Sequence, residues 1–102
     1  MEGLQMIPLD SIIYCESDSN YTTIFLKNKR KIVVSRTLKE LDEMLEGYLM
    51  LRVHRCFIIN LNEVEKYIKG DGGYLIMSDG STVDVSKTRK DLLMQKLQPS
   101  KF

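Results

Sequence analysis

Three cationic or titratable side chains stand directly before an apolar stretch in the middle of the chain. The run reads Arg52-Val53-His54-Arg55-Cys56 and leads into residues 57–60. In an extended strand, side chains alternate between two faces, so Arg52 and His54 would share one face while Arg55 occupies the other. Residues of this type usually meet an anion. Because the chain has no metal-ligand pattern, phosphate is the leading candidate, and the arginine fork matches phosphate and guanine acceptors alike.

The same run could support nucleophilic catalysis. His54 and Cys56 are two residues apart, so a base and a thiol would share a strand face. The sequence supplies no acid or amide to orient the histidine, and Cys56 leads directly into the apolar stretch. We therefore expect no enzyme activity and no catalytic residue. For His54, a pH switch and a hydrogen-bonded structural role both stay open, and the structural role is favoured.

The charges of the chain are segregated although they nearly cancel. The net charge is +1 over 102 residues. Clusters of basic residues can steer a polyanion to one face of a protein, or they can be solvated turns. The run at residues 27–31 is a second candidate for phosphate contact, or a solvated hairpin tip that prevents edge pairing. The basic clusters are Lys27-Asn28-Lys29-Arg30-Lys31 and Lys87, Arg89 and Lys90, and the acidic cluster is Glu40, Asp42, Glu43 and Glu46.

Length and cysteine usage bound the class of protein. A chain of this length predicts one domain, spanning residues 1–102 with a core at about 7–97. Cys15 and Cys56 form no metal or redox motif, which indicates a reducing compartment. Neither a signal peptide nor an apolar run long enough to cross a membrane is present. We expect a cytoplasmic protein that needs no cofactor and no metal.

The elements that must position these side chains are mostly short strands. Apolar and β-branched residues predict strands at 12–15, 21–26, 31–35, 57–60, 64–68, 74–77 and 82–85. Asp79-Gly80 is a strong signal for a hairpin turn. We expect a mostly-β domain, sandwich-like or meandering, with eight or nine strands in all.

Two short helices complete the prediction. Thr37 and Glu40 have capping-box spacing before a stripe of leucines that ends at Gly47. A last helix would begin near Thr88 and end before Pro99, and Thr88 together with Asp91 could cap its start. The acidic outer face of the first helix makes it a poor candidate for lying against DNA.

At this point the chain resembles the LytTR domain, the DNA-binding domain of LytTR-type bacterial response regulators, over about residues 7–97. No single block of the resemblance is decisive, but their order and spacing agree with the family. The blocks are Ile12-Ile13-Tyr14-Cys15-Glu16, Asn20-Tyr21, Thr37-Leu38-Lys39-Glu40-Leu41, Leu51 through Asn60, Asp79-Gly80 and Val83-Asp84-Val85-Ser86-Lys87. Cys56 stands where the family often has serine, and Lys87 where it often has arginine.

The resemblance implies an elongated, mostly-β fold of about ten short strands in small sheets with one or two short helices. It also implies that loops, and not a helix, enter successive major grooves of double-stranded DNA. The family typically binds direct repeats about one helical turn apart, often as two copies. Many members carry a receiver domain before the DNA-binding domain, and that domain would lie outside this chain.

Carried over by position, the base contacts of the family fall on Asn20, Arg55 and Lys87. Asparagine pairs well with adenine and arginine with guanine, whereas lysine at Lys87 would read a base less sharply than arginine. Asn20 could instead serve turn geometry, and Arg55 could form a surface ion pair with the acidic helix.

Residues around these three suit contacts with the DNA backbone, because hydroxyls, cations and backbone donors at a helix start all bind phosphate. Ser86 or Thr88 could instead cap the last helix, and Tyr21 could belong to the core. The candidate backbone contacts are Tyr21, Arg52, His54, Cys56, Ser86, Thr88, Arg89 and Lys90.

These observations favour a sequence-specific DNA-binding transcription regulator, the output domain of a two-component response regulator. The expected partners are double-stranded DNA and a second copy of the chain on it. The alternative is a β-rich protein-interaction module that uses a sheet edge or the acidic helix. Salt separates the two, because counterion release makes DNA affinity fall steeply as the salt concentration rises.

Overall fold

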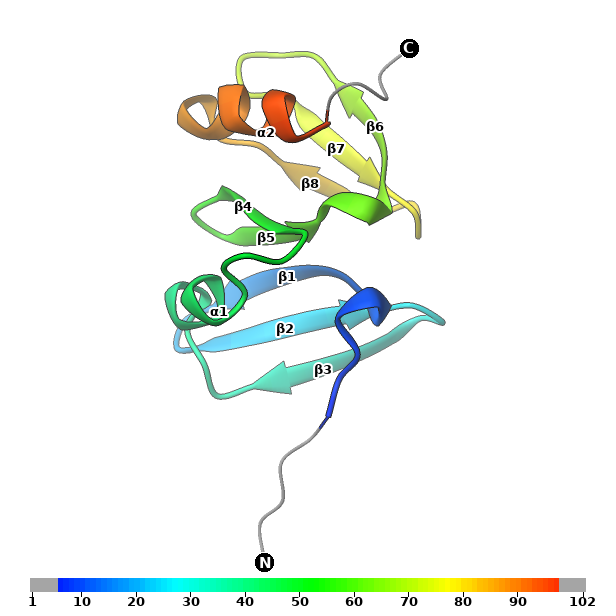
Figure 1. Ribbon diagram of the computed structural model, residues 1–102, viewed down its shortest axis with the longest axis vertical. Helices are drawn as coiled ribbons and strands as arrows, with labels where there is room; N and C mark the ends of the chain where they lie inside the picture. The colour runs from blue at the N-terminus through cyan, green and yellow to red at the C-terminus, as the bar shows by residue number, and fades with distance from the viewer. Residues whose placement is uncertain (1–5, 98–102) are drawn as a thin grey trace, which may run out of the picture.

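The computed structural model describes residues 6–97, and Figure 1 shows two sheets stacked along its long axis. The strands are β1 (Ile12–Asp18), β2 (Tyr21–Leu26), β3 (Arg30–Val34), β4 (Met50–His54), β5 (Phe57–Asn60), β6 (Val64–Ile68), β7 (Tyr74–Met77) and β8 (Thr82–Asp84). Two α-helices, α1 (Leu38–Met44) and α2 (Lys90–Leu97), and three 3-10 turns, η1 (Leu9–Ser11), η2 (Leu61–Glu63) and η3 (Lys87–Arg89), complete the described chain.

Both sheets are antiparallel. The larger sheet has the order β3-β2-β1-β5-β4, and the smaller has the order β6-β7-β8. Strand β1 pairs with its sequence neighbour β2 and also with β5, where Glu16 stands opposite Phe57. This pairing brings segments about 40 residues apart in the chain to the same end of the larger sheet.

The alternation of β2 is typical of a strand with one buried face. Thr22, Ile24 and Leu26 are buried, while Tyr21 is exposed and the residues between are half-buried. The hairpin at Asp79-Gly80 forms as predicted, with the Ser81 amide donating to Asp79 and Gly80 at a φ of 86°. Only glycine adopts that left-handed backbone without strain.

The capping box of α1 is also confirmed. The Thr37 hydroxyl accepts from the Glu40 amide at 3.2 Å, and the Glu40 carboxylate accepts from the Thr37 amide at 3.1 Å. These bonds to Thr37 lower the pKa of the Glu40 carboxyl below its ordinary value. Leu38 and Leu41 pack inward, and Gly47, at a φ of 88°, follows the helix end.

Two hydrophobic clusters share the larger sheet. One includes Cys15, Ile24 and Ile58, packed under α1. The other joins Val53 and residues of the smaller sheet to Leu93 of α2. Burial raises the pKa of the Cys15 thiol to about 12, so this cysteine behaves as a small apolar residue.

The mostly-β fold class is confirmed, with several differences in detail. The described residues contain eight strands, fewer than the ten that the resemblance implied. Thr88 lies inside η3, so it does not cap the last helix, and Pro99 lies outside the described residues. None of the helices between residues 6 and 97 is long and apolar enough to cross a membrane.

The run at residues 52–60 is a hairpin and not one continuous strand. Strand β4 ends at His54, β5 begins at Phe57, and Arg55 and Cys56 form the turn between them. The face assigned to Arg55 from strand alternation was therefore wrong. The chain reverses direction at Arg55 and Cys56 so that His54 can pair with Phe57, and strand alternation does not apply within the turn.

Candidate nucleic-acid interface

Three segments distant in sequence meet along one side of the molecule. They are the β1–β2 turn, the β4–β5 turn with the end of β4, and the start of η3 and α2 (residues 19–21, 52–56 and 86–90), which we call the three-segment edge. In Figure 1 all three lie on the left, one above another along the long axis. Backbone bonds join them: the Ser17 amide donates to Cys56 at 2.9 Å, and the Ser86 amide donates to Val53 at 2.8 Å.

The β1–β2 turn presents two exposed candidates. Ser19 takes the left-handed backbone at a φ of 57°, so Asn20 is not the residue that relieves turn strain. Both Asn20 and Tyr21 are exposed, and Tyr21 keeps 52% of its surface accessible. The alternative that Tyr21 belongs to the core is therefore wrong.

The β4–β5 turn is held by the side chains around it. The Arg52 guanidinium donates through Nη2 to the Arg55 carbonyl at 2.7 Å and through Nε to the His54 carbonyl at 3.4 Å. His54 Nδ1 accepts from the Cys56 amide at 3.1 Å, so this histidine contacts the cysteine backbone and has a structural role. Arg55 itself is exposed at the tip. The turn thus presents one arginine and uses another to fix its own shape.

The third segment opens with Ser86 and presents Lys87 and Thr88 to solvent. Arg89 is half-buried, and its Nη1 donates to the Arg52 carbonyl at 3.4 Å, which ties η3 to β4. Lys90 is also half-buried and begins α2.

A close backbone approach supports the third segment from behind. A Cβ on Gly72 would lie 1.9 Å from the Val85 carbonyl oxygen, so only glycine fits there. The Gly72 carbonyl also accepts from the Tyr67 hydroxyl at 2.7 Å. The loop between β6 and β7 therefore fixes the backbone that leads into Lys87.

Arg55, Lys87 and Lys90 of the three-segment edge take part in no ion pair within the described residues. Within the described chain the ion pairs are Lys27 with Glu63 and Arg36 with Glu40, each at 3.4 Å. Neither involves Arg55, so its alternative as a surface ion pair with the acidic helix is not found in the described residues. Between residues 6 and 97, no three histidine, cysteine or acidic side chains are grouped to hold a metal ion.

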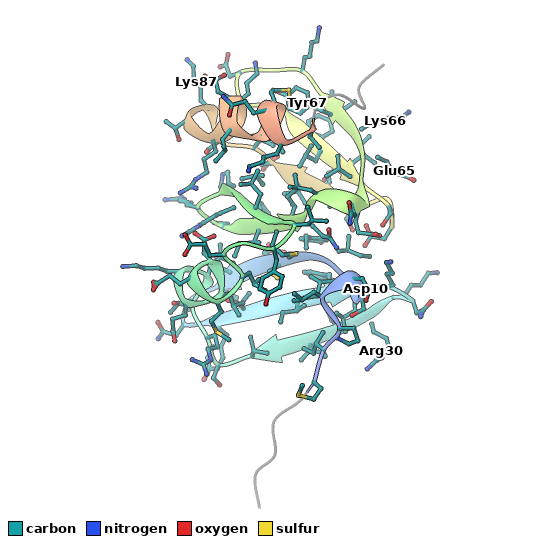
Figure 2. All side chains as sticks on the ribbon, viewed as in Figure 1. Asp10, Arg30, Glu65, Lys66, Tyr67 and Lys87 are labelled. Atoms are coloured by element: carbon teal, nitrogen blue, oxygen red, sulfur yellow. The ribbon has the colours of Figure 1, made fainter. Side chains whose placement is uncertain are left out.

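The basic run at residues 27–31 does not join this edge. Residues 27–29 form the β2–β3 turn, and Arg30 and Lys31 begin β3. This turn lies at the end of β2 opposite to the β1–β2 turn, and Figure 2 shows Arg30 and Lys87 on opposite sides. Asn28 and Lys29 take left-handed backbone, and Lys27 is paired with Glu63. The structure thus separates two basic regions that the sequence could not distinguish.

Two features that shape the edge are not evident from the sequence. The Arg52 guanidinium binds the carbonyls of its own turn, and its contact with DNA phosphates stays a prediction. The close approach of Gly72 to Val85 depends on tertiary packing, so no local pattern predicts it. The only signal in the sequence was the glycine-rich loop Gly70-Asp71-Gly72-Gly73.

Known proteins resemble this chain in sequence and in fold. Residues 2–98 match the family model of the LytTr DNA-binding domain. Two relatives from Paraburkholderia xenovorans (strain LB400), the heme-containing CO-sensing transcriptional regulators RcoM 2 and RcoM 1, are 33% and 30% identical over 95 residues. These matches cover 90% of this chain and 35% of each relative, so the chain spans about a third of their length.

Among solved structures, the LytTr DNA-binding domain of a protein described as a methyl-accepting/DNA response regulator from Bacillus cereus superposes with a TM-score of 0.80. It is 22% identical to this chain, and the match covers 91% of this chain and 86% of that one. At this level of identity the likeness concerns the fold. The family model matches nearly the whole sequence, and the family is one of DNA-binding domains and not of enzymes. The chain belongs to the LytTR family of DNA-binding domains.

Proposed function

We propose that the chain reads specific double-stranded DNA sequences through the three-segment edge. The observation that carries this proposal is that the β1–β2 turn, the β4–β5 turn and the start of η3 lie on one side of the molecule (Figure 1), where Asn20, Arg55 and Lys87 are each exposed. Because the segments are stacked along the long axis, they suit successive major grooves on one side of a duplex.

The three base-reading candidates have different chemistry. Arg55 presents a guanidinium fork from a turn held by Arg52, and it suits the O6 and N7 acceptors of guanine. Asn20 suits adenine, which offers one donor and one acceptor in the major groove. Lys87 can also reach guanine, with less geometric control than arginine has.

Residues around these candidates suit the sugar–phosphate backbone. Lys90 and Arg89 supply charge, and the Ser86 and Thr88 hydroxyls, 3.4 Å apart, supply donors near the start of η3. Tyr21 offers an exposed ring and hydroxyl at the β1–β2 turn. We place Arg52, His54 and Cys56 in this group chiefly as residues that shape the β4–β5 turn. Such contacts fix the register of the protein on DNA without reading sequence.

The wider role that we propose is transcription regulation in the bacterial cytoplasm. Both curated relatives are described as transcriptional regulators, and this chain spans only about a third of each. We further propose that two copies bind direct repeats about one helical turn apart, and that a receiver domain outside this chain controls their pairing.

Selection of bound duplexes from a random library, using the full chain, tests the proposal. We expect enrichment of one motif, repeated in the same direction. The selected duplex is then titrated at several salt concentrations, and log affinity should fall with a slope of about −0.9 per phosphate contacted.

The same selection with Arg55→Ala is the matched test of base reading. It should enrich a motif that is relaxed at one base pair and otherwise unchanged. Equal loss of affinity on every sequence would reduce Arg55 to a phosphate contact. A folded wild-type chain that enriches nothing at low salt would contradict sequence-specific binding by this chain.

A further inference from the structure

A wide groove of about 1030 Å³ lies beside the acidic helix. Its walls come from the end of α1, the segment between α1 and β4, η1 and α2. It shares only Arg52 with the three-segment edge. The groove is therefore a second surface, next to the proposed DNA interface but built from other residues.

Three apolar side chains of its lining are exposed to solvent, and we call these three its apolar floor. Tyr48 is 60% exposed, Leu49 is 56% exposed and Leu92 is 46% exposed, and all three line the groove. Single exposed apolar residues are ordinary, but several that share one concave surface mark an interaction site.

The charged residues of the lining are mostly acidic, and we call its carboxylates the acidic rim. Neither ion pair of the described chain involves the carboxylates of the groove. Each of these carboxylates would repel a DNA phosphate. Lys96 is a cation on the α2 side. An occupant must therefore bring positive charge toward α1 and apolar side chains toward the floor. The acidic rim consists of Asp10, Asp42, Glu43 and Glu46.

We propose that this groove docks a positively charged amphipathic helix of a partner protein. Lysine or arginine side chains would face Glu43 and Glu46, and apolar side chains would cover Leu49 and Leu92. An amphipathic helix laid in an apolar groove is a recurrent mode of peptide recognition. The proposal goes beyond DNA binding and does not depend on it.

A second copy of the chain fits the groove less well. Its most basic protrusion is the β2–β3 turn, whose tip Lys27-Asn28-Lys29-Arg30-Lys31 carries no apolar side chain. That turn could meet the acidic rim and would leave the floor uncovered. The charge and the apolar area of the groove together favour a foreign amphipathic segment.

The probe is a synthetic amphipathic peptide of leucine and lysine at helical spacing, about 14 residues or four turns long. Fluorescence anisotropy measures binding of the peptide to the full chain. NMR amide shifts of the ¹⁵N-labelled chain then locate the residues that the peptide contacts. We expect shifts at Tyr48, Leu49 and Leu92. The same peptide with glutamate in place of lysine should bind at least about tenfold more weakly, because like charges meet at the rim.

Three exposed groove residues are changed, and one exposed residue outside the groove gives the control. Glu43→Lys combined with Glu46→Lys should weaken the lysine peptide at least about tenfold, because it reverses two rim charges. Leu49→Ser should also weaken binding of the lysine peptide, because it removes an apolar side chain from the floor. Glu65→Lys makes the same kind of charge change on exposed β6, outside the groove, and should leave affinity unchanged.

Three results would overturn the proposal. One is equal weakening by Glu65→Lys, which would indicate attraction to overall charge. Another is a set of amide shifts at the three-segment edge in place of the groove. The third is sedimentation of the wild-type chain as a dimer that Leu49→Ser dissociates, since the occupant would then be a second copy. DNA affinity, measured on the same variants, reports on the proposed function separately.

Discussion

The β2–β3 turn and the three-segment edge are both basic, yet they differ in how they are built. The turn gathers four cations within five consecutive residues, at an exposed hairpin tip. The edge gathers its cations from two of three segments separated along the chain, and hydrogen bonds from Ser17, Arg89 and Ser86 hold the segments together. Charge density alone would select the turn.

The difference teaches that base reading needs held geometry more than it needs charge. A cation on a free hairpin tip attracts any phosphate, and its direction is not fixed. Arg55 stands on a turn whose carbonyls are bound by Arg52, so the backbone that carries its side chain is held in place. Preorganisation of this kind lowers the entropy cost of binding.

The largest effect is expected where the edge rests on the core. Leu93 of α2 is fully buried, in the same cluster as Val53 of β4. Leu93→Ala should lower the free energy of unfolding by about 2–5 kcal/mol, because it leaves a cavity beneath two segments of the edge. Urea unfolding measures this change. The neighbouring Leu92 is 46% exposed, so Leu92→Ala is the control and should cost far less; equal losses would contradict the packing described for α2.

Arg55→Ala and Arg30→Ala compare the two regions directly. Both arginines are exposed. Arg55→Ala should reduce affinity for the selected duplex by about 1–3 kcal/mol, because a bidentate contact with guanine is lost. Arg30→Ala should change it little. Titrations of the selected duplex and of a shuffled duplex check both variants, and a larger loss from Arg30→Ala would reverse the assignment of the interface.

Arg52→Ala should have an intermediate effect. It removes the 2.7 Å bond to the Arg55 carbonyl, and a hydrogen bond is worth about 1 kcal/mol. Affinity for the selected duplex should fall, while the slope of log affinity against log salt stays constant. A slope reduced by about one would show that Arg52 contacts phosphate itself. Arg52→Lys should rescue little, because lysine lacks the planar fork that binds two carbonyls.

Local signals in the sequence predicted the local structure. The capping box at Thr37 and Glu40, the hairpin at Asp79-Gly80 and the alternation of β2 each depend on a few neighbouring residues. All three are confirmed. The break between β4 and β5 at Arg55-Cys56 was missed, because neither residue is a usual turn former and the pairing partner of each strand lies beyond the turn.

The site was less accessible to reasoning from residues alone. A family resemblance, and not a local pattern, selected Asn20, Arg55 and Lys87 as one group. Their segments are brought to one side of the molecule by the pairing of β1 with β5 and by the bond from Ser86 to Val53. No local pattern encodes either contact. The groove beside α1 had still less signal, since exposed Tyr48 and Leu49 look in sequence like ordinary apolar residues.

The smallest effect separates the two basic regions by salt dependence. Lys90 begins α2 at the edge, whereas Lys31 lies in β3 beside the β2–β3 turn. Lys90→Ala should weaken every duplex about equally and reduce the salt slope by about one, because one phosphate contact is lost. Lys31→Ala should leave the slope unchanged. Identical slopes for the two variants would mean that phosphates meet both regions or neither, and a changed base preference in Lys90→Ala would assign that lysine to reading. Only a selective loss at Lys90 fits a polyanion that follows the three-segment edge and does not reach the far end of β2.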